Sequence, residues 1–338
     1  MHGGNRWAAA ARLGIPPERF IDFSANLNPL GPPRGVRRVL QEAADRIEEY
    51  PEPEYLELRQ AIAAAAGVGR ENVFVGNGAS EILQLWAYVN RPARAIVLPP
   101  TYGEYARAVR IAGGVVVDGG AHPEATGDVV FCCNPNNPTG RLLAREEVLS
   151  LSARGKTLLV DESFLGFAGE ADGLTLGREA ASGEGVFVLV SLTKLYALPG
   201  LRLGYAIAPR EAIRDLEEAA TPWRVNALAE AAGRAALADE AFREATRRVV
   251  TVERQYLTAE LAGLPGVLVY PGAANFLLLR VPRTDLGEML ARRGLLVRDC
   301  RNFLGLDEYH LRVAVRRREE NETLIRALKE ILGGDGSV

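Results

Sequence analysis

The middle of the chain alternates short apolar runs with stretches whose apolar residues recur at helical spacing. The apolar runs lie at 72–76, 94–99, 114–119, 128–133, 157–162, 186–191 and 203–208. Within each range the apolar residues are consecutive and do not alternate with polar residues, which is typical of strands covered on both faces. Helical stretches such as 79–90 and 101–113 fall between several of them. This pattern predicts an α/β fold around a mostly parallel sheet of seven strands.

The pattern changes after Pro222. Two long helical stretches are followed by a strand at 274–281, a helix at 285–293, a strand at 310–315 and a closing helix. The start of the chain is rich in glycine, proline and asparagine, and we expect it to form an extended arm. We therefore predict three parts: an N-terminal arm at 1–34 that packs with the small domain, a large domain at 35–222 and a small α+β domain at 223–338.

Composition narrows the class of protein. The chain has 338 residues, of which 48% are hydrophobic and 25% charged, as in ordinary globular proteins. Its net charge of −3, with both signs mixed, gives no indication of a nucleic-acid partner. No apolar run reaches the roughly 18 residues that a membrane span needs, so no membrane partner is expected. The three cysteines predict no disulfide framework and a cytoplasmic protein, and the three histidines are too scattered for a metal site.

Charged residues stand at the ends of apolar runs, where burial is costly unless the charge is used. Asp161 ends one run, Lys194 follows another and Arg202 opens a third, and Lys194 is one of only three lysines. In doubly wound sheets, ligands bind at the carboxyl ends of the strands, where Asp161 and Lys194 fall. These positions predict a binding site for a group that uses an acid, an amine and a guanidinium.

Two loops add to this site. "GNGASE" at 76–81 follows a strand and opens a helix, and the N–H groups of a helix start bind phosphate. A dinucleotide fingerprint is the other reading of this loop, but the third glycine and the acid for a ribose are missing. "NPNNPTG" at 134–140 would by itself be typical of a turn.

Together with "PPTYGEY" at 99–105, "DESF" at 161–164 and "SLTKLYALPGLRLGY" at 191–205, these loops resemble the fold-type-I family of pyridoxal-phosphate enzymes, the class I/II aminotransferase superfamily. The five motifs occur in the family's order, and the resemblance covers nearly the whole chain. It implies that Lys194 binds the cofactor covalently, Asp161 pairs with its ring nitrogen, Tyr102 stacks on its ring and Asn137 contacts its phenolic oxygen. Phe164 departs from the family, which usually has a tyrosine there.

The resemblance also implies a cup for the cofactor phosphate. Its residues would be Gly78, Ala79, Ser80, Ser191, Thr193 and Arg202. Tyr50 resembles the tyrosine that such enzymes donate across a homodimer to the phosphate in the neighbour's site. A half-buried core tyrosine is the other reading of Tyr50.

Residues for a substrate come from the small domain and the arm. Arg312 matches the family's substrate-carboxylate arginine. Arg298 matches an arginine that holds the substrate phosphate in histidinol-phosphate aminotransferases, although a rim salt bridge with Asp299 or a neighbour is an alternative role. The opening "HGGN" and "DFSANLNPLGPP" at 22–33 resemble the threonine-phosphate decarboxylases. That resemblance places His2 at the substrate phosphate and Asn26 near its carboxylate. An ordinary, untied terminus is the alternative for "HGGN".

These resemblances favour one function over two others. The favoured function is decarboxylation of L-threonine O-3-phosphate, a small phosphorylated amino acid, to aminopropanol phosphate, a step of cobalamin biosynthesis. The alternative is an aminotransferase that acts on a phosphorylated substrate such as histidinol phosphate. A non-catalytic regulator that only binds the cofactor is disfavoured, because the cofactor residues are complete and no basic DNA-binding module is present.

Overall fold

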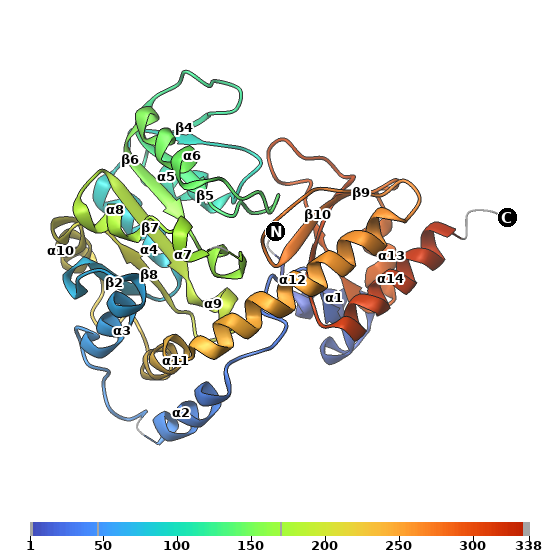
Figure 1. Cartoon of the computed structure of the whole chain (residues 1–338), viewed down its shortest axis with the longest axis horizontal. Helices are drawn as coiled ribbons and strands as arrows, with labels where there is room; N and C mark the ends of the chain where they lie inside the picture. Colours follow the sequence, from blue (N-terminus) through green and yellow to red (C-terminus); the bar gives the residue numbers. More distant parts are fainter. Residues whose placement is uncertain (1–2, 46, 170, 334–338) are drawn as a thin grey trace.

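The computed structural model describes residues 3–45, 47–169 and 171–333, which form a large and a smaller domain, with the helix of the N-terminal arm on the smaller domain (Figure 1). The large domain is built on a seven-stranded sheet with the spatial order β2 (Val73–Gly76), β8 (Gly204–Ile207), β7 (Val186–Ser191), β6 (Gly155–Asp161), β5 (Gly127–Cys133), β3 (Arg94–Val97) and β4 (Val115–Asp118). β8 runs in the direction opposite to that of the other six strands of this sheet. All seven strands expected from the sequence are present, so the predicted α/β fold is confirmed.

Helices cover both faces of this sheet, as the continuously apolar strands require. On β5, Phe131 belongs to a cluster with Trp86, whereas its neighbour Val130 belongs to a cluster with Ala180 on the opposite face. The helices of this part are α2 (Arg34–Ala44), α3 (Leu56–Ala66), α4 (Ala79–Asn90), α5 (Glu104–Ile111), α6 (Arg145–Ser150), α7 (Ala171–Leu174), α8 (Gly177–Ser182), α9 (Leu192–Leu195) and α10 (Arg210–Ala219). Short 3₁₀ turns lie at η2 (Arg70–Asn72), η3 (Leu151–Arg154) and η4 (Leu165–Phe167).

The smaller domain has a four-stranded antiparallel sheet. Its strands, in spatial order, are β12 (Arg298–Asp299), β13 (His310–Ala314), β10 (Phe276–Arg280) and β9 (Leu268–Val269). Its helices are α13 (Leu286–Arg292), α14 (Arg318–Gly333) and the far half of α12 (Glu240–Ala262). α12 bridges the two domains, because its Phe242 stacks on Tyr196 while its Leu257 and Leu261 enter the small-domain core.

The helix α11 (Ala227–Leu237) lies beside α2 and α3, and its alanines share a cluster with Leu58. The division of the chain at residues 34 and 222 stays a prediction. None of the helices in the described ranges has the length and apolar character to cross a bilayer.

The arm is partly helical, where the sequence led us to expect an extended segment. Residues 6–13 form α1 (Arg6–Leu13), which follows from its run of alanines and from Asn5, whose Oδ1 accepts the Ala8 N–H at 3.0 Å as an N-cap. The arm continues through η1 (Pro17–Arg19) to β1 (Ile21–Asp22), which pairs in parallel with β11 (Leu295–Leu296).

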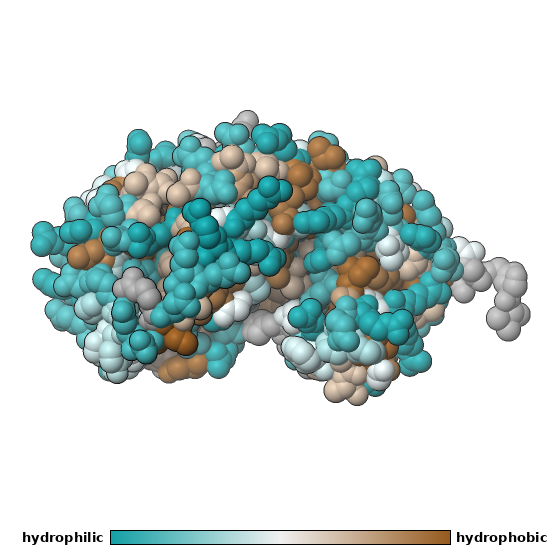
Figure 2. All heavy atoms as spheres, turned by 90° about the horizontal axis from the view of Figure 1, so that it is seen from below, coloured by the Kyte–Doolittle hydropathy of each residue, from teal (hydrophilic) through white to brown (hydrophobic). Residues whose placement is uncertain are grey.

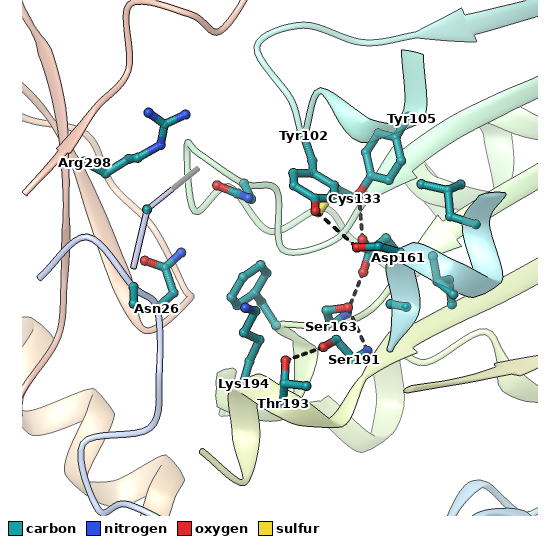
Figure 3. Close-up of a pocket in the computed structure, with 18 of the residues that line it drawn as sticks. Asn26, Tyr102, Tyr105, Cys133, Asp161, Ser163, Ser191, Thr193, Lys194 and Arg298 are labelled. Carbon is teal, nitrogen blue, oxygen red and sulfur yellow. Dashed lines mark hydrogen bonds between the residues drawn. The ribbon is translucent and has the colours of Figure 1, made fainter. Parts of the chain in front are cut away.

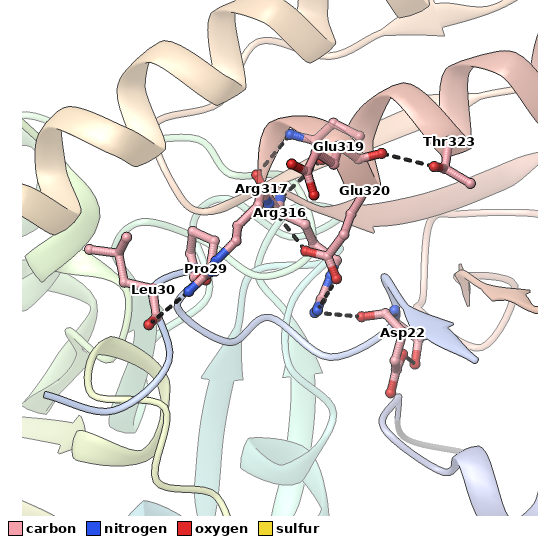
Figure 4. A network of polar contacts seen from close by, with 10 residues as sticks. Asp22, Pro29, Leu30, Arg316, Arg317, Glu319, Glu320 and Thr323 are labelled. Atoms are coloured by element: carbon pink, nitrogen blue, oxygen red, sulfur yellow. Dashed lines mark hydrogen bonds and ion pairs between the residues drawn. The ribbon is translucent and has the colours of Figure 1, made fainter. Parts of the chain in front are cut away.

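Two arginines that follow β13 also hold this arm (Figure 4). Arg316 Nη1 donates to the Asp22 carbonyl at 3.2 Å, and Arg317 Nε donates to the Pro29 carbonyl at 2.8 Å. The arm is therefore fixed against the smaller domain along most of its described length.

Candidate active site

A cavity of about 210 Å³ lies at the carboxyl edge of the large sheet, where the two domains and the arm meet (Figure 3). The molecular surface is hollowed between the two domains on the face seen in Figure 2. The predicted site residues that line the cavity are Asn26, Ala79, Ser80, Tyr102, Asn137, Asp161, Ser191, Thr193, Lys194, Arg202, Arg298 and Arg312. They come from the arm and from segments spread along the chain as far as β13, so the fold brings together what the motifs only suggested.

Asp161 ends β6 and supplies a carboxylate to the cavity wall. Asp161 is only 6% exposed. Tyr105 Oη donates to Oδ2 at 2.7 Å, and the Ser163 N–H donates to Oδ1 at 2.9 Å. Within the described part of the chain, these two donors are its partners and no ion pair is formed. The buried charge therefore lacks a cation that a ligand would provide.

Lys194 lies on the one-turn helix α9, directly after β7. Burial, together with the positive charges of Arg312 and Arg202, lowers the pKa of its amine to about 8. The turn before it is tied to the Asp161 loop, because the Ser191 N–H donates to Ser163 Oγ at 2.9 Å. The two hydroxyls of Ser191 and Thr193 lie 2.7 Å apart and hydrogen bond to each other.

The start of α4 and Arg202 form a cradle for an anion. Gly78 precedes the helix with φ +86°, and a Cβ there would lie 2.6 Å from Arg202 Nη2. A Cβ on Gly204 would lie 2.5 Å from the Ala79 nitrogen. Both glycines therefore allow a guanidinium and the backbone N–H groups of a 12-residue helix to converge.

The ring of Tyr102 forms another wall. It meets the ring of Tyr105 edge-on at 5.4 Å, and its hydroxyl lies 3.5 Å from Ser80 Oγ. Burial raises the pKa of Tyr102, so the phenol stays neutral near pH 7. Phe164 also lines the cavity and packs edge-on against Phe276 at 5.0 Å.

Two buried arginines stand on the side of the cavity away from Asp161. Arg312 Nη1 donates to Asn137 Oδ1 and Nη2 donates to the Ser24 carbonyl at 2.9 Å, while its Nε has no partner among the described atoms. Asn26 Oδ1 is likewise buried without a partner there. Buried polar atoms are nearly always hydrogen bonded, so these orphaned atoms indicate a ligand in this part of the cavity.

Arg298 lies at the cavity wall on β12. Its Nη1 donates to the Asp299 carbonyl at 2.5 Å, its Nη2 donates to Asn302 Oδ1 at 2.7 Å, and its guanidinium lies 5.2 Å from the Phe303 ring. The alternative that Arg298 forms a salt bridge with the Asp299 carboxylate is wrong, because Arg301 takes that carboxylate at 2.7 Å.

Three of the predicted site residues lie elsewhere. Gly78 sits just behind the cavity wall, as the start of α4 requires. Tyr50 is 79% exposed and packs on Trp223 with ring centroids 4.5 Å apart, so the reading of Tyr50 as a half-buried core residue is wrong. His2 lies outside the described residues. Its neighbour Gly3 lines the cavity.

Sequence reasoning missed three wall residues that matter to the geometry: Ser24, Tyr105 and Ser163. Ser163 lies inside the "DESF" motif and Tyr105 inside "PPTYGEY", so both motifs marked the right segments. Ser24 lies inside "DFSANLNPLGPP", but its backbone carbonyl, which accepts from Arg312, carries no mark in the sequence.

Comparison with known proteins extends this description. A family model described as "Aminotransferase class I and II" matches residues 18–328. The threonine-phosphate decarboxylase of Salmonella typhimurium is 39% identical over 98% of this chain and 97% of that protein. The histidinol-phosphate aminotransferase of Moorella thermoacetica is 36% identical over 95% of this chain and 87% of that protein. The crystal structure of L-threonine-O-3-phosphate decarboxylase from Porphyromonas gingivalis has a TM-score of 0.84 and 30% identity over 92% of this chain and 99% of that one.

Proposed function

Because the chain belongs to the class I and II aminotransferase family, we propose that it is a pyridoxal-phosphate enzyme that decarboxylates L-threonine O-3-phosphate to aminopropanol phosphate. The observation that carries this proposal is the pair of buried arginines, Arg298 and Arg312, in a cavity walled by the N-terminal arm. A substrate with a carboxylate at one end and a phosphate at the other matches two guanidinium groups. The relative from Salmonella typhimurium, which aligns over almost the full chain, supports this reaction.

The cavity residues fit pyridoxal 5′-phosphate. Lys194 offers an amine with a lowered pKa, Asp161 offers a buried carboxylate without a cation partner, and α4 with Arg202 offers an anion cradle. Further polar and aromatic side chains line the same cavity, namely those of Tyr102, Asn137, Ser191 and Thr193. When bound, the cofactor supplies an electron sink for the negative charge that is left on Cα.

The protein's own residues then orient the substrate and manage a proton. Arg298 and Arg312 hold the two anionic ends, so the direction of the bond between Cα and the carboxylate is fixed before it breaks. Arg312 Nε, which has no partner in the described structure, is free to donate to the substrate carboxylate, and Asn26 Oδ1 is free to accept from a donor group of the substrate. Release of carbon dioxide leaves an electron pair at Cα that must take up a proton. Lys194 Nζ, whose pKa is about 8, is suited to deliver it.

The test is to give the purified protein L-threonine O-3-phosphate and to measure carbon dioxide and aminopropanol phosphate. Glutamate with imidazole-acetol phosphate is run in parallel. The relative from Moorella thermoacetica supports this second candidate, an aminotransferase. Transamination without carbon dioxide would establish the aminotransferase, and cofactor binding with neither reaction would favour the regulator.

The arm gives a prediction about the substrate side of the site. A Cβ added to Gly3 would lie 2.1 Å from the Ser24 carbonyl oxygen, so Gly3→Ala must push the arm away from the cavity. We expect turnover of threonine phosphate to fall about ten- to a hundredfold, because small misplacements near the substrate are expensive, while cofactor binding stays unchanged. Deleting residues 1 to 5 should act in the same direction.

The control for Gly3→Ala is Gly35→Ala, on α2, where an added Cβ meets nothing within 4 Å. Steady-state kinetics and the visible absorbance of the bound cofactor are measured for both variants. Full activity of the Gly3 variant and of the truncated protein would mean that the "HGGN" opening is an ordinary terminus.

We further propose that the protein is a two-fold homodimer with shared active sites. Tyr50 lies outside the cavity of its own chain and is exposed beside Trp223, in a surface groove that Ile47 and Leu228 also line. A two-fold interface uses the same surface on both partners, so each Tyr50 can enter the neighbour's site. This arrangement supports a contact from Tyr50 to the neighbour's cofactor phosphate.

Mixed dimers test this sharing. Lys194→Ala and Tyr50→Ala subunits, each inactive or weak alone, should regain about a quarter of the parent activity when mixed, because half of the dimers are mixed and each of these has one intact site. In the control experiment, Tyr88→Ala is used in place of Tyr50→Ala, because Tyr88 is a comparably exposed tyrosine on α4. This variant should already be highly active before it is mixed with Lys194→Ala. A fully active monomer, or no recovery on mixing, would contradict the shared site.

A further inference from the structure

Tyr105 is part of the cavity wall and contacts the Asp161 carboxylate of the candidate cofactor site. It is the second residue of α5, only 1% exposed, and its hydroxyl donates to Asp161 Oδ2 at 2.7 Å. Nothing in the sequence motifs or in the cavity lining required this residue to make such a bond.

The ring of Tyr105 is held on two sides. It stacks on Phe131 of β5 with centroids 5.2 Å apart and planes 9° from parallel. It also meets the ring of Tyr102 edge-on at 5.4 Å. A rigid ring between two aromatic neighbours gives its hydroxyl one position, and that position is at Asp161.

The Tyr105 hydroxyl keeps its proton and so acts as a hydrogen-bond donor. Burial and the nearby charge of Asp161 raise the pKa of Tyr105 well above its usual range, so the proton stays on the phenol. Together with the Ser163 N–H on Oδ1, it leaves the carboxylate with one donor on each oxygen (Figure 3). Each oxygen keeps a second lone pair for the cavity.

We propose that Tyr105 is a positioning residue that orients the Asp161 carboxylate toward the cofactor's ring nitrogen. A donor fixed on each oxygen holds the carboxylate in one orientation, and a carboxylate in that place can pair with a protonated ring nitrogen. The Tyr105 ring also contacts Tyr102. One side chain therefore positions both Asp161, which is expected at the cofactor's ring nitrogen, and Tyr102, which is expected on the face of the cofactor ring. The inference rests on the proposed function, because it assigns Asp161 to the cofactor.

The test is a double-mutant cycle between Tyr105→Phe and Asp161→Asn. Tyr105→Phe keeps the stacked ring and removes only the hydroxyl, so we expect the dissociation constant for pyridoxal phosphate to rise about tenfold, with kcat lowered similarly and KM unchanged. Adding Tyr105→Phe to Asp161→Asn should change the dissociation constant by less than about twofold, because the bond acts only through the charged carboxylate.

Tyr55→Phe is the matched control. Tyr55 is equally buried, and its hydroxyl accepts the Val225 N–H at 3.0 Å, away from the cavity. Both single variants should lose some thermal stability, but only Tyr105→Phe should weaken cofactor binding. Additive effects in the cycle, or equal effects of Tyr105→Phe and Tyr55→Phe on cofactor affinity, would overturn the role of Tyr105. A parent protein that binds no pyridoxal phosphate would instead overturn the proposed function.

Discussion

Lys194→Ala is expected to reduce turnover of L-threonine O-3-phosphate at least about 10,000-fold, because it removes the amine that carries the covalent chemistry. The environment of Lys194 explains why this lysine is the reactive one. With a pKa of about 8, roughly one amine in ten is neutral at pH 7, far more than for a free lysine. The variant should still bind pyridoxal phosphate through the α4 and Arg202 cradle, although more weakly.

The two other lysines provide the controls for this prediction. Lys156 is exposed and pairs with Asp128 at 3.0 Å, and Lys329 is exposed and pairs with Glu260 at 2.8 Å. Lys156→Ala and Lys329→Ala should keep full activity. In the parent protein, borohydride reduction followed by peptide mapping should place the cofactor label on Lys194. A label on either of the other lysines would overturn the assignment of the site.

The sheet could be predicted from the sequence because its signal is local. Each of the seven central strands contains a short continuous apolar run, and in the inner strands most residues of the run are buried. The strands β9, β11 and β12 were not predicted, since two residues are too few to show a period. The helix α1 was obscured by the glycine, proline and asparagine on either side of it.

The site residues also divide into those that a local motif marks and those that only the folded chain brings together. Lys194, Asp161 and the α4 loop were predicted because each lies inside a motif whose spacing is set along the chain. The bond between Tyr105 and Asp161 joins residues that are 56 positions apart, and the bond from Arg312 to Ser24 spans 288. Such contacts depend on strand order and on where the arm docks. A single sequence does not specify either, so Tyr105 and Ser24 were missed.

Arg312→Gln is expected to lower kcat/KM for threonine phosphate by about two to three orders of magnitude, since it removes one buried partner of the substrate carboxylate. The buried guanidinium lies at the junction of the large domain, the arm and β13, where it bonds Asn137 and the Ser24 carbonyl. Arg312→Lys should fall between the parent and the glutamine variant, because it keeps the charge but loses the planar fork. Cofactor binding should persist in both.

Arg316→Gln is the matched control, because Arg316 follows the same strand and also bonds an arm carbonyl, that of Asp22, but does not line the cavity. Its kcat/KM should stay within about threefold of the parent, as expected for a bond far from the substrate. A second measurement separates charge from packing. Arg312 is the nearby charge that most lowers the pKa of Lys194, so Arg312→Gln should raise that pKa and slow modification of the cofactor-free amine at pH 8. Unchanged kinetics in Arg312→Gln, or equal losses in the two glutamine variants, would remove Arg312 from the substrate site.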